Sequence, residues 1–208
     1  MPSGGKTARP GAAPRTRPPE LLRKLISAAM ECERRTMQLY CAYEALFAKP
    51  EEVRAFWFDM AEHESRHYGA LAMVAGLLES APQRTLPAAP TLTRAHVLHL
   101  RAVLDKAEAE ARPGLTLTRA FETALEIESS EIDDLVLDLL SALKGEQARE
   151  RATQMLIHDL GDLSYMVEKY GNNRALLARV DRQIEQQVHR LRSPGSAPLR
   201  ALPVRKPR

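Results

Sequence analysis

Residues 57–71 of the chain read WFDMAEHESRHYGAL. Within this stretch Trp57, Met60 and Leu71 recur at helical spacing, so they share one face of an amphipathic helix. Glu64 falls on the same face, at a position where another apolar residue would continue the stripe. The stretch therefore predicts a helix that turns one carboxylate toward the protein core.

Three other segments with helical periodicity carry an acidic residue in the same situation. An unpaired carboxylate in a protein core costs several kcal/mol even after the structure relaxes, so four in one core require compensating positive charge. Metal cations are the simplest source of that charge. The three further residues are Glu33 in residues 19–47, Glu128 in residues 118–144 and Asp159 in residues 147–170.

The spacing of the four acidic residues supports the same arrangement. The first two are 31 residues apart, and so are the last two. The midpoint of each interval falls at an expected turn, beside Pro50 in the first hairpin and Gly145 in the second. About fifteen residues of helix, or roughly 22 Å, separate each carboxylate from its turn. All four are therefore predicted to meet near the middle of a bundle.

The predicted fold class is all-α, with a four-helix bundle over residues 19–171. The long crossover between the second and third bundle helices includes a further helix over residues 94–112, which would span roughly 28 Å. After a break at Gly171-Asn172-Asn173, an amphipathic segment predicts a short C-terminal helix within residues 172–192. Nothing in the sequence is typical of a β-strand.

Both ends of the chain are basic and rich in Pro. Residues 1–18 carry four basic side chains and residues 190–208 carry six, with no acidic residue in either stretch. Subtracting these ten charges from the formal net charge of +3 leaves −7 for residues 19–189. Residues 1–18 and 193–208 are predicted to be disordered tails. The acidic body favours cation binding, and nucleic acid is expected to bind only through the tails.

No apolar run approaches the roughly 20 residues that cross a membrane, and the N-terminus lacks the apolar stretch of a secretory signal. A cytoplasmic protein without a membrane partner is expected. Cys32 and Cys41 lie nine positions apart on one predicted helix and so on nearly opposite faces, which excludes a disulfide between them there. No Cys-x-x-Cys pair occurs, which excludes zinc ribbons and rubredoxin-type iron sites.

The side chains near the four carboxylates extend the candidate metal site. His67 follows Glu64 by three residues, so both can bind one ion from the same helix face. Tyr40, seven residues after Glu33, and Tyr68, four residues after Glu64, could donate hydrogen bonds to carboxylates or simply pack in the core. His63 and His158 are interpreted as surface residues. The candidate metal ligands are Glu33, Glu64, His67, Glu128, Glu131, Asp159 and Asp162.

Three of the helices resemble those of rubrerythrin and the wider ferritin-like superfamily, over about residues 22–170. The resemblance implies a ferritin-like bundle with a di-iron site, with manganese as the other candidate metal. Such a site reacts with peroxide or oxygen or oxidises iron for storage, in a homo-oligomer of two or more chains. The fourth helix departs from the pattern at Asp159 and Asp162, and the rubredoxin-like module of rubrerythrins is absent. The matching stretches are Ala29-Met30-Glu31-Cys32-Glu33 with Tyr40, residues 58–67, and Ala124-Leu125-Glu126-Ile127-Glu128 with Glu131.

A second hypothesis keeps the bundle without the metal. The protein would then be a non-catalytic helical scaffold or binding module whose basic tails dock a partner. In that case Glu128 and Asp159 would pair with Arg or His side chains instead of an ion, or would be more exposed to water. The two hypotheses make different predictions about the contacts of these two carboxylates.

Overall fold

The computed structural model describes residues 20–80, 94–130 and 146–192, and every regular element in these ranges is helical. The predicted all-α class is therefore confirmed for the described residues. The predicted helical segments over residues 19–47 and 94–112 have ends that agree with the structure within two residues. In chain order the elements are α1 (Glu20–Leu46), α2 (Glu51–Ser80), α3 (Arg94–Glu110), α4 (Leu117–Glu128), α6 (Glu146–Met166), the π-helical turn η1 (Val167–Gly171) and α7 (Arg174–Arg192).

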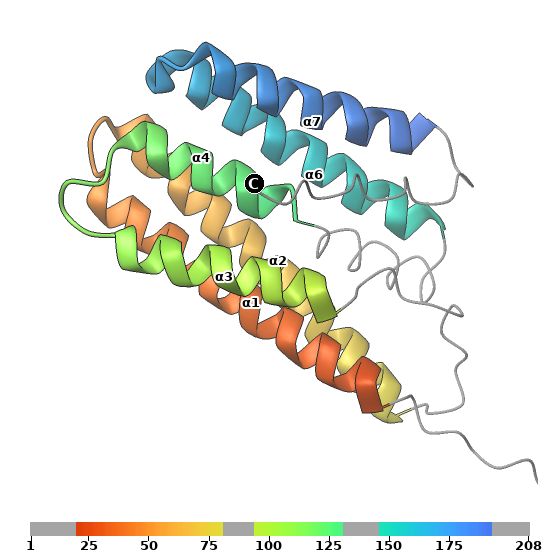
Figure 1. The fold of residues 1–208 in the computed structure, drawn as a ribbon. Helices are drawn as coiled ribbons and strands as arrows, with labels where there is room; N and C mark the ends of the chain where they lie inside the picture. Colours follow the sequence, from red (N-terminus) through yellow and green to blue (C-terminus); the bar gives the residue numbers. More distant parts are fainter. Residues whose placement is uncertain (1–19, 81–93, 131–145, 193–208) are drawn as a thin grey trace, which may run out of the picture.

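The helices pack in two neighbouring pairs, with α3 and α4 completing the interior (Figure 1). α1 and α2 form a long hairpin, and α3 lies along α1. α6 and α7 form the second pair, with α7 on the outer side of α6. α4 contacts α3, α6 and η1, so it joins the two pairs. This packing brings α1, α2, α4 and α6 around one interior.

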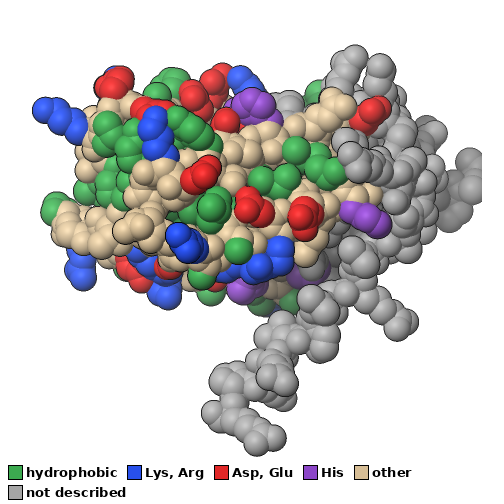
Figure 2. Space-filling view, turned by 90° about the horizontal axis from the view of Figure 1, so that it is seen from above, with side chains coloured by type: hydrophobic (Ala, Val, Ile, Leu, Met, Phe, Trp, Pro, Cys, Tyr) green, Lys and Arg blue, Asp and Glu red, His purple; other side chains and the backbone are tan. Residues whose placement is uncertain are grey.

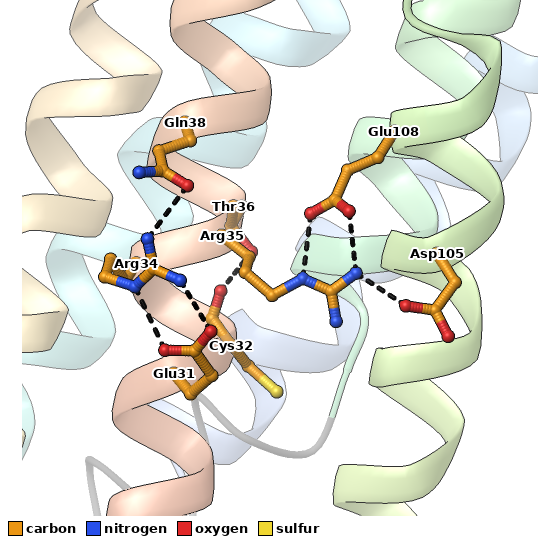
Figure 3. A network of polar contacts seen from close by, with 8 residues as sticks. All are labelled: Glu31, Cys32, Arg34, Arg35, Thr36, Gln38, Asp105 and Glu108. Atoms are coloured by element: carbon orange, nitrogen blue, oxygen red, sulfur yellow. Dashed lines mark hydrogen bonds and ion pairs between the residues drawn. The ribbon is translucent and has the colours of Figure 1, made fainter.

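A charged network fixes α3 against α1 (Figure 3). The guanidinium of Arg35 donates through Nε to Glu108 Oε1 at 2.8 Å, and through Nη2 to Glu108 Oε2 at 2.8 Å and Asp105 Oδ1 at 2.6 Å. The side chain of Arg35 is only 16% exposed, whereas its partners Asp105 and Glu108 are 69% and 42% exposed. Arg34 instead pairs within α1, with Glu31 one turn earlier. Arg35 therefore links α1 to α3, whereas the contacts of Arg34 stay within α1.

α4 is shorter than the sequence predicts. The helix begins after Thr116, whose side-chain oxygen accepts a hydrogen bond from the Arg119 N–H at 3.2 Å. It ends at Glu128, so the prediction of one uninterrupted helix over residues 118–144 is wrong at this point, and residues 131–144 lie outside the described residues. Ser129 and Ser130 follow, and serine hydroxyls compete for backbone hydrogen bonds and so disfavour helix interiors.

The connection from α6 to α7 follows the predicted break. α6 continues into η1, and Asn172 then takes a left-handed conformation with φ 43°. Asn173 caps α7, because its side-chain oxygen accepts the Leu176 N–H at 3.0 Å. The predicted break at residues 171–173 and the helix after it are confirmed.

A second charged group joins the end of α6 to the start of α2. The Glu52 carboxylate accepts hydrogen bonds from the hydroxyls of Tyr165 and Tyr170 and from Lys169 Nζ. These three donors, led by Lys169, lower the pKa of Glu52 to about 2. The contact ties η1 to the opposite helix pair.

Aromatic side chains fill the interior between the α1–α2 hairpin and α4. Trp57 is fully buried, and its ring centroid lies 5.6 Å from that of Tyr40, 4.9 Å from Tyr43 and 4.8 Å from Phe56. Phe121 of α4 stacks on the same indole at 5.6 Å. Such ring pairs add to the hydrophobic stabilisation of the core. This cluster holds α4 against the hairpin and sets the position of Glu128 at its end.

The face of the molecule seen in Figure 2 intersperses apolar side chains with acidic and basic ones. Over the described residues, the helices do not include one with the length and apolarity that a membrane crossing requires. The predicted tails, the linker at residues 81–93, Glu131 and the turn at Gly145 lie outside the described residues.

Candidate metal centre

The four core carboxylates predicted from the sequence are all buried. Glu33, Glu128 and Asp159 are each 3% exposed, and Glu64 is 4% exposed. They come from α1, α4, α6 and α2 respectively, so each of the four central helices contributes one. The prediction that these side chains point into the core is confirmed.

Three candidate ligands converge between α1 and α2. The Nδ1 atom of His67 lies 3.6 Å from Glu64 Oε2 and 3.8 Å from Glu33 Oε2. One ligand atom from each side chain lies within 4.8 Å of the other two. In the described part of the chain, no other three acidic, histidine or cysteine side chains meet this closely. The predicted i, i+3 pair on α2 thus faces the predicted ligand on α1.

Glu128 reaches the cluster from α4 and receives a hydrogen bond from α1. The Tyr40 hydroxyl, which is fully buried, donates to Glu128 Oε1 at 2.8 Å. Burial raises the pKa of Tyr40 well above its ordinary value of 10.0, and the charges of Glu128 and Glu64 raise it further. Tyr40 therefore stays protonated and acts as the donor, as the sequence predicts.

Asp159 has a partner that the prediction assigned to the surface. His63 on α2 is only partly exposed, at 16% of its side chain, and its Nδ1 lies 2.8 Å from Asp159 Oδ1. The contact with Asp159 raises the pKa of His63, and burial opposes this shift. The interpretation of His63 as a surface residue is therefore wrong. The missed signal is its spacing, because His63 and His67 are four residues apart and share one face of α2.

The remaining predicted site residues lie away from this interior. Asp162 has a side chain 51% exposed and lies 3.3 Å from the Nδ1 atom of His158, which is 71% exposed as predicted. Tyr68 is 38% exposed. Glu131 is outside the described residues. The structure thus brings together Glu33, Glu64, His67, Glu128 and Asp159, with Tyr40 and His63 beside them.

Burial dominates the electrostatics of the cluster. It raises the pKa of Glu33 well above its ordinary value of 4.5, and the charge of Glu64 and a hydrogen bond with it raise the pKa further, while His67 opposes. Burial also raises the pKa of Glu128, against the lowering effect of the Tyr40 hydrogen bond. Without a cation, burial therefore favours the protonated forms of Glu33 and Glu128.

Comparison of the chain with known protein families, with curated proteins and with solved structures yields no match. The chemistry of the site therefore has to be inferred from the residues that form it and from their geometry.

Proposed function

We propose that the protein is a metal-binding protein of the ferritin-like class, and that Glu33, Glu64 and His67 bind a transition-metal ion. The observation that carries this proposal is the convergence of these three side chains in a buried interior. Iron is the first candidate and manganese the second, because mixed carboxylate and imidazole ligands suit both metals.

The distances and charges of the cluster fit an ion. Ligand atoms that share one ion at bonds of about 2.1 Å lie about 3 to 3.5 Å apart. The 3.6 and 3.8 Å separations of His67 Nδ1 from the two carboxylates are close to this range. Four ionised carboxylates carry four negative charges, of which a protonated His63 would offset one, and His67 has to be neutral to bind an ion. A divalent cation would offset two of the three charges that remain, so protonation of one carboxyl group would leave the site neutral.

The ferritin-like class is proposed from the arrangement of ligands on the helices. In that class, one Glu from each of two helices joins a Glu-x-x-His pair from each of two others. Here α1 and α4 provide Glu33 and Glu128, and α2 provides the Glu64–His67 pair. α6 provides Asp159 without a histidine three residues later.

The proposed role is iron handling or the reduction of peroxide or oxygen. Bound iron supplies the redox chemistry of such a site. The chain's own residues bind and orient the ion and exclude water, since every carboxylate involved is at most 4% exposed. Tyr40 holds Glu128 in place through its hydroxyl.

Metal analysis of a matched pair of variants tests the binding site. Glu64→Ala removes a carboxylate next to both Glu33 and His67, so we expect the anaerobically Fe(II)-loaded protein to lose its iron. The fold should persist, since the change also removes a buried charge, and circular dichroism checks this. Glu62→Ala is the control, because Glu62 pairs with Arg66 on the exposed side of α2. Iron retained by Glu64→Ala at the wild-type amount would refute the assignment.

One observation favours the second hypothesis, a helical scaffold without metal. Asp159 contacts His63, as that hypothesis requires of a carboxylate paired within the protein. Under this hypothesis the purified protein contains no iron or manganese, and chelators leave its unfolding midpoint unchanged. Metal content and chelator sensitivity, measured on the same preparation, distinguish the two functions.

A further inference from the structure

The carboxylate cluster has two unequal halves. In the α1–α2 half, Glu33 and Glu64 face each other and His67. In the α4–α6 half, Glu128 accepts a hydrogen bond from the Tyr40 hydroxyl at 2.8 Å, and Asp159 Oδ1 lies 2.8 Å from His63 Nδ1. The first half collects ligands around one point, whereas the second half is already bridged to neighbouring helices.

The two histidines of α2 serve different halves. His67 lies against Glu33 of α1, and His63, one turn earlier on the same helix face, lies against Asp159 of α6. Since both imidazoles extend from one rigid helix, His63 cannot follow an ion toward α1 without leaving Asp159. An ion bound by Asp159 and Glu128 would have to displace His63 from a buried contact.

We propose that the cluster binds one metal ion, at Glu33, Glu64 and His67, and that His63 sets this limit by occupying Asp159. This inference rests on the proposed function and narrows it, because the resemblance to ferritin-like proteins implies two ions. His63 then determines how many ions the cluster binds, because its imidazole occupies Asp159, which would otherwise bind a second ion. Its removal should turn a one-ion site into a two-ion site.

Titration of the full-length protein with Co(II) tests the proposed limit of one ion per chain. The protein is stripped with a chelator, dialysed, and titrated by calorimetry, and bound cobalt is then measured by elemental analysis. We expect one ion per wild-type chain and two per His63→Ala chain, the second binding within about tenfold of the first. His158→Ala is the matched control, since His158 also neighbours Asp159 but is 71% exposed. It should bind one ion.

Each result has a separate meaning. Two ions of similar affinity on the wild-type chain would overturn the one-ion limit and leave the metal-binding function intact. No bound ion on the wild-type chain would overturn the function itself. A single ion on a folded His63→Ala chain would show that His63 does not set the limit.

A measurement on the wild-type protein keeps the test independent of the folding of the variant. With excess Cd(II), the wild-type chain should give one cadmium NMR signal from the cluster. Two signals would overturn the proposal. The His63→Gln variant, whose side-chain amide can still donate to Asp159, should also give one.

Discussion

At the scale of single residues, the main feature is the cost of burying acids. Glu33 and Glu128 are each 3% exposed, and burial is the largest cause of the raised pKa of each. A carboxyl group in this situation binds either a proton or a cation. Protons and metal ions therefore compete for the same oxygen atoms, and metal affinity should increase with pH.

The pH dependence of the metal-free protein follows from these shifts. Above the ordinary pKa of 4.5, the folded chain keeps protons on Glu33 and Glu128 that the unfolded chain has lost. The folded state then binds more protons, so the free energy of unfolding falls as pH rises. Urea unfolding in chelator at about pH 5 and about pH 8 should show this decrease. It should be smaller in Glu33→Gln, and a metal-free wild type that becomes more stable over this interval would contradict the prediction.

At the scale of helices, ion pairs between distant segments help to determine how the outer elements dock. Arg35 holds α3 on α1, and Glu52 holds η1 on α2. Neither pair was apparent from helical periodicity, because each joins residues more than 70 positions apart, as in the 73-residue separation of Arg35 and Glu108. The apolar stripes bring the helices together, and these pairs help to select one register.

The docking of α3 can be tested with adjacent arginines. Arg35→Ala breaks the fork to Glu108 and Asp105 and should lower the free energy of unfolding by about 1 kcal/mol, a value reduced for the exposure of the two acids. Arg34→Ala removes only a pair within α1 and should leave the unfolding midpoint unchanged. Urea denaturation measures both variants. Equal effects of the two changes would show that the fork does not hold α3 in place.

At the scale of the whole molecule, an ion bound by Glu33, Glu64 and His67 should join α1 to α2, the hairpin against which α4 and α6 pack. Glu128 of α4 and Asp159 of α6 lie beside this site and contact Tyr40 of α1 and His63 of α2. An ion that binds only the folded state stabilises the entire fold by mass action. The stability of the protein therefore reports on occupancy of the site.

Metal addition should raise the unfolding temperature of the wild-type protein. At a free ion concentration of about 100 times Kd, the stabilisation is about 2.7 kcal/mol, or about 5 to 10 °C for a chain of this size. The shift should be absent in Glu64→Ala and present in Glu62→Ala. Calorimetric scans with metal and with chelator measure it, and identical scans of the wild-type protein would argue against a specific site.

Periodicity alone identified much of the site. An acidic residue that interrupts an apolar stripe is predicted to be buried. This prediction is confirmed for all four such residues, Glu33, Glu64, Glu128 and Asp159. A hydrogen bond from Tyr40 to a carboxylate was also considered from its position two turns beyond Glu33 on the same helix face. By contrast, Asp162 follows Asp159 by three residues but is half exposed, since spacing along a helix indicates a face only approximately.

The sequence by itself determined the helices, most of their ends apart from that of α4, and the acids that enter the core, because these depend on local spacing and on the cost of exposing apolar surface. Only the tertiary structure decided which side chains meet across helices. The pairing of His63 with Asp159, and the consequent difference between the two halves of the cluster, depends on how α2 and α6 are rotated against each other. That rotation arises from packing between distant segments, which no local pattern records.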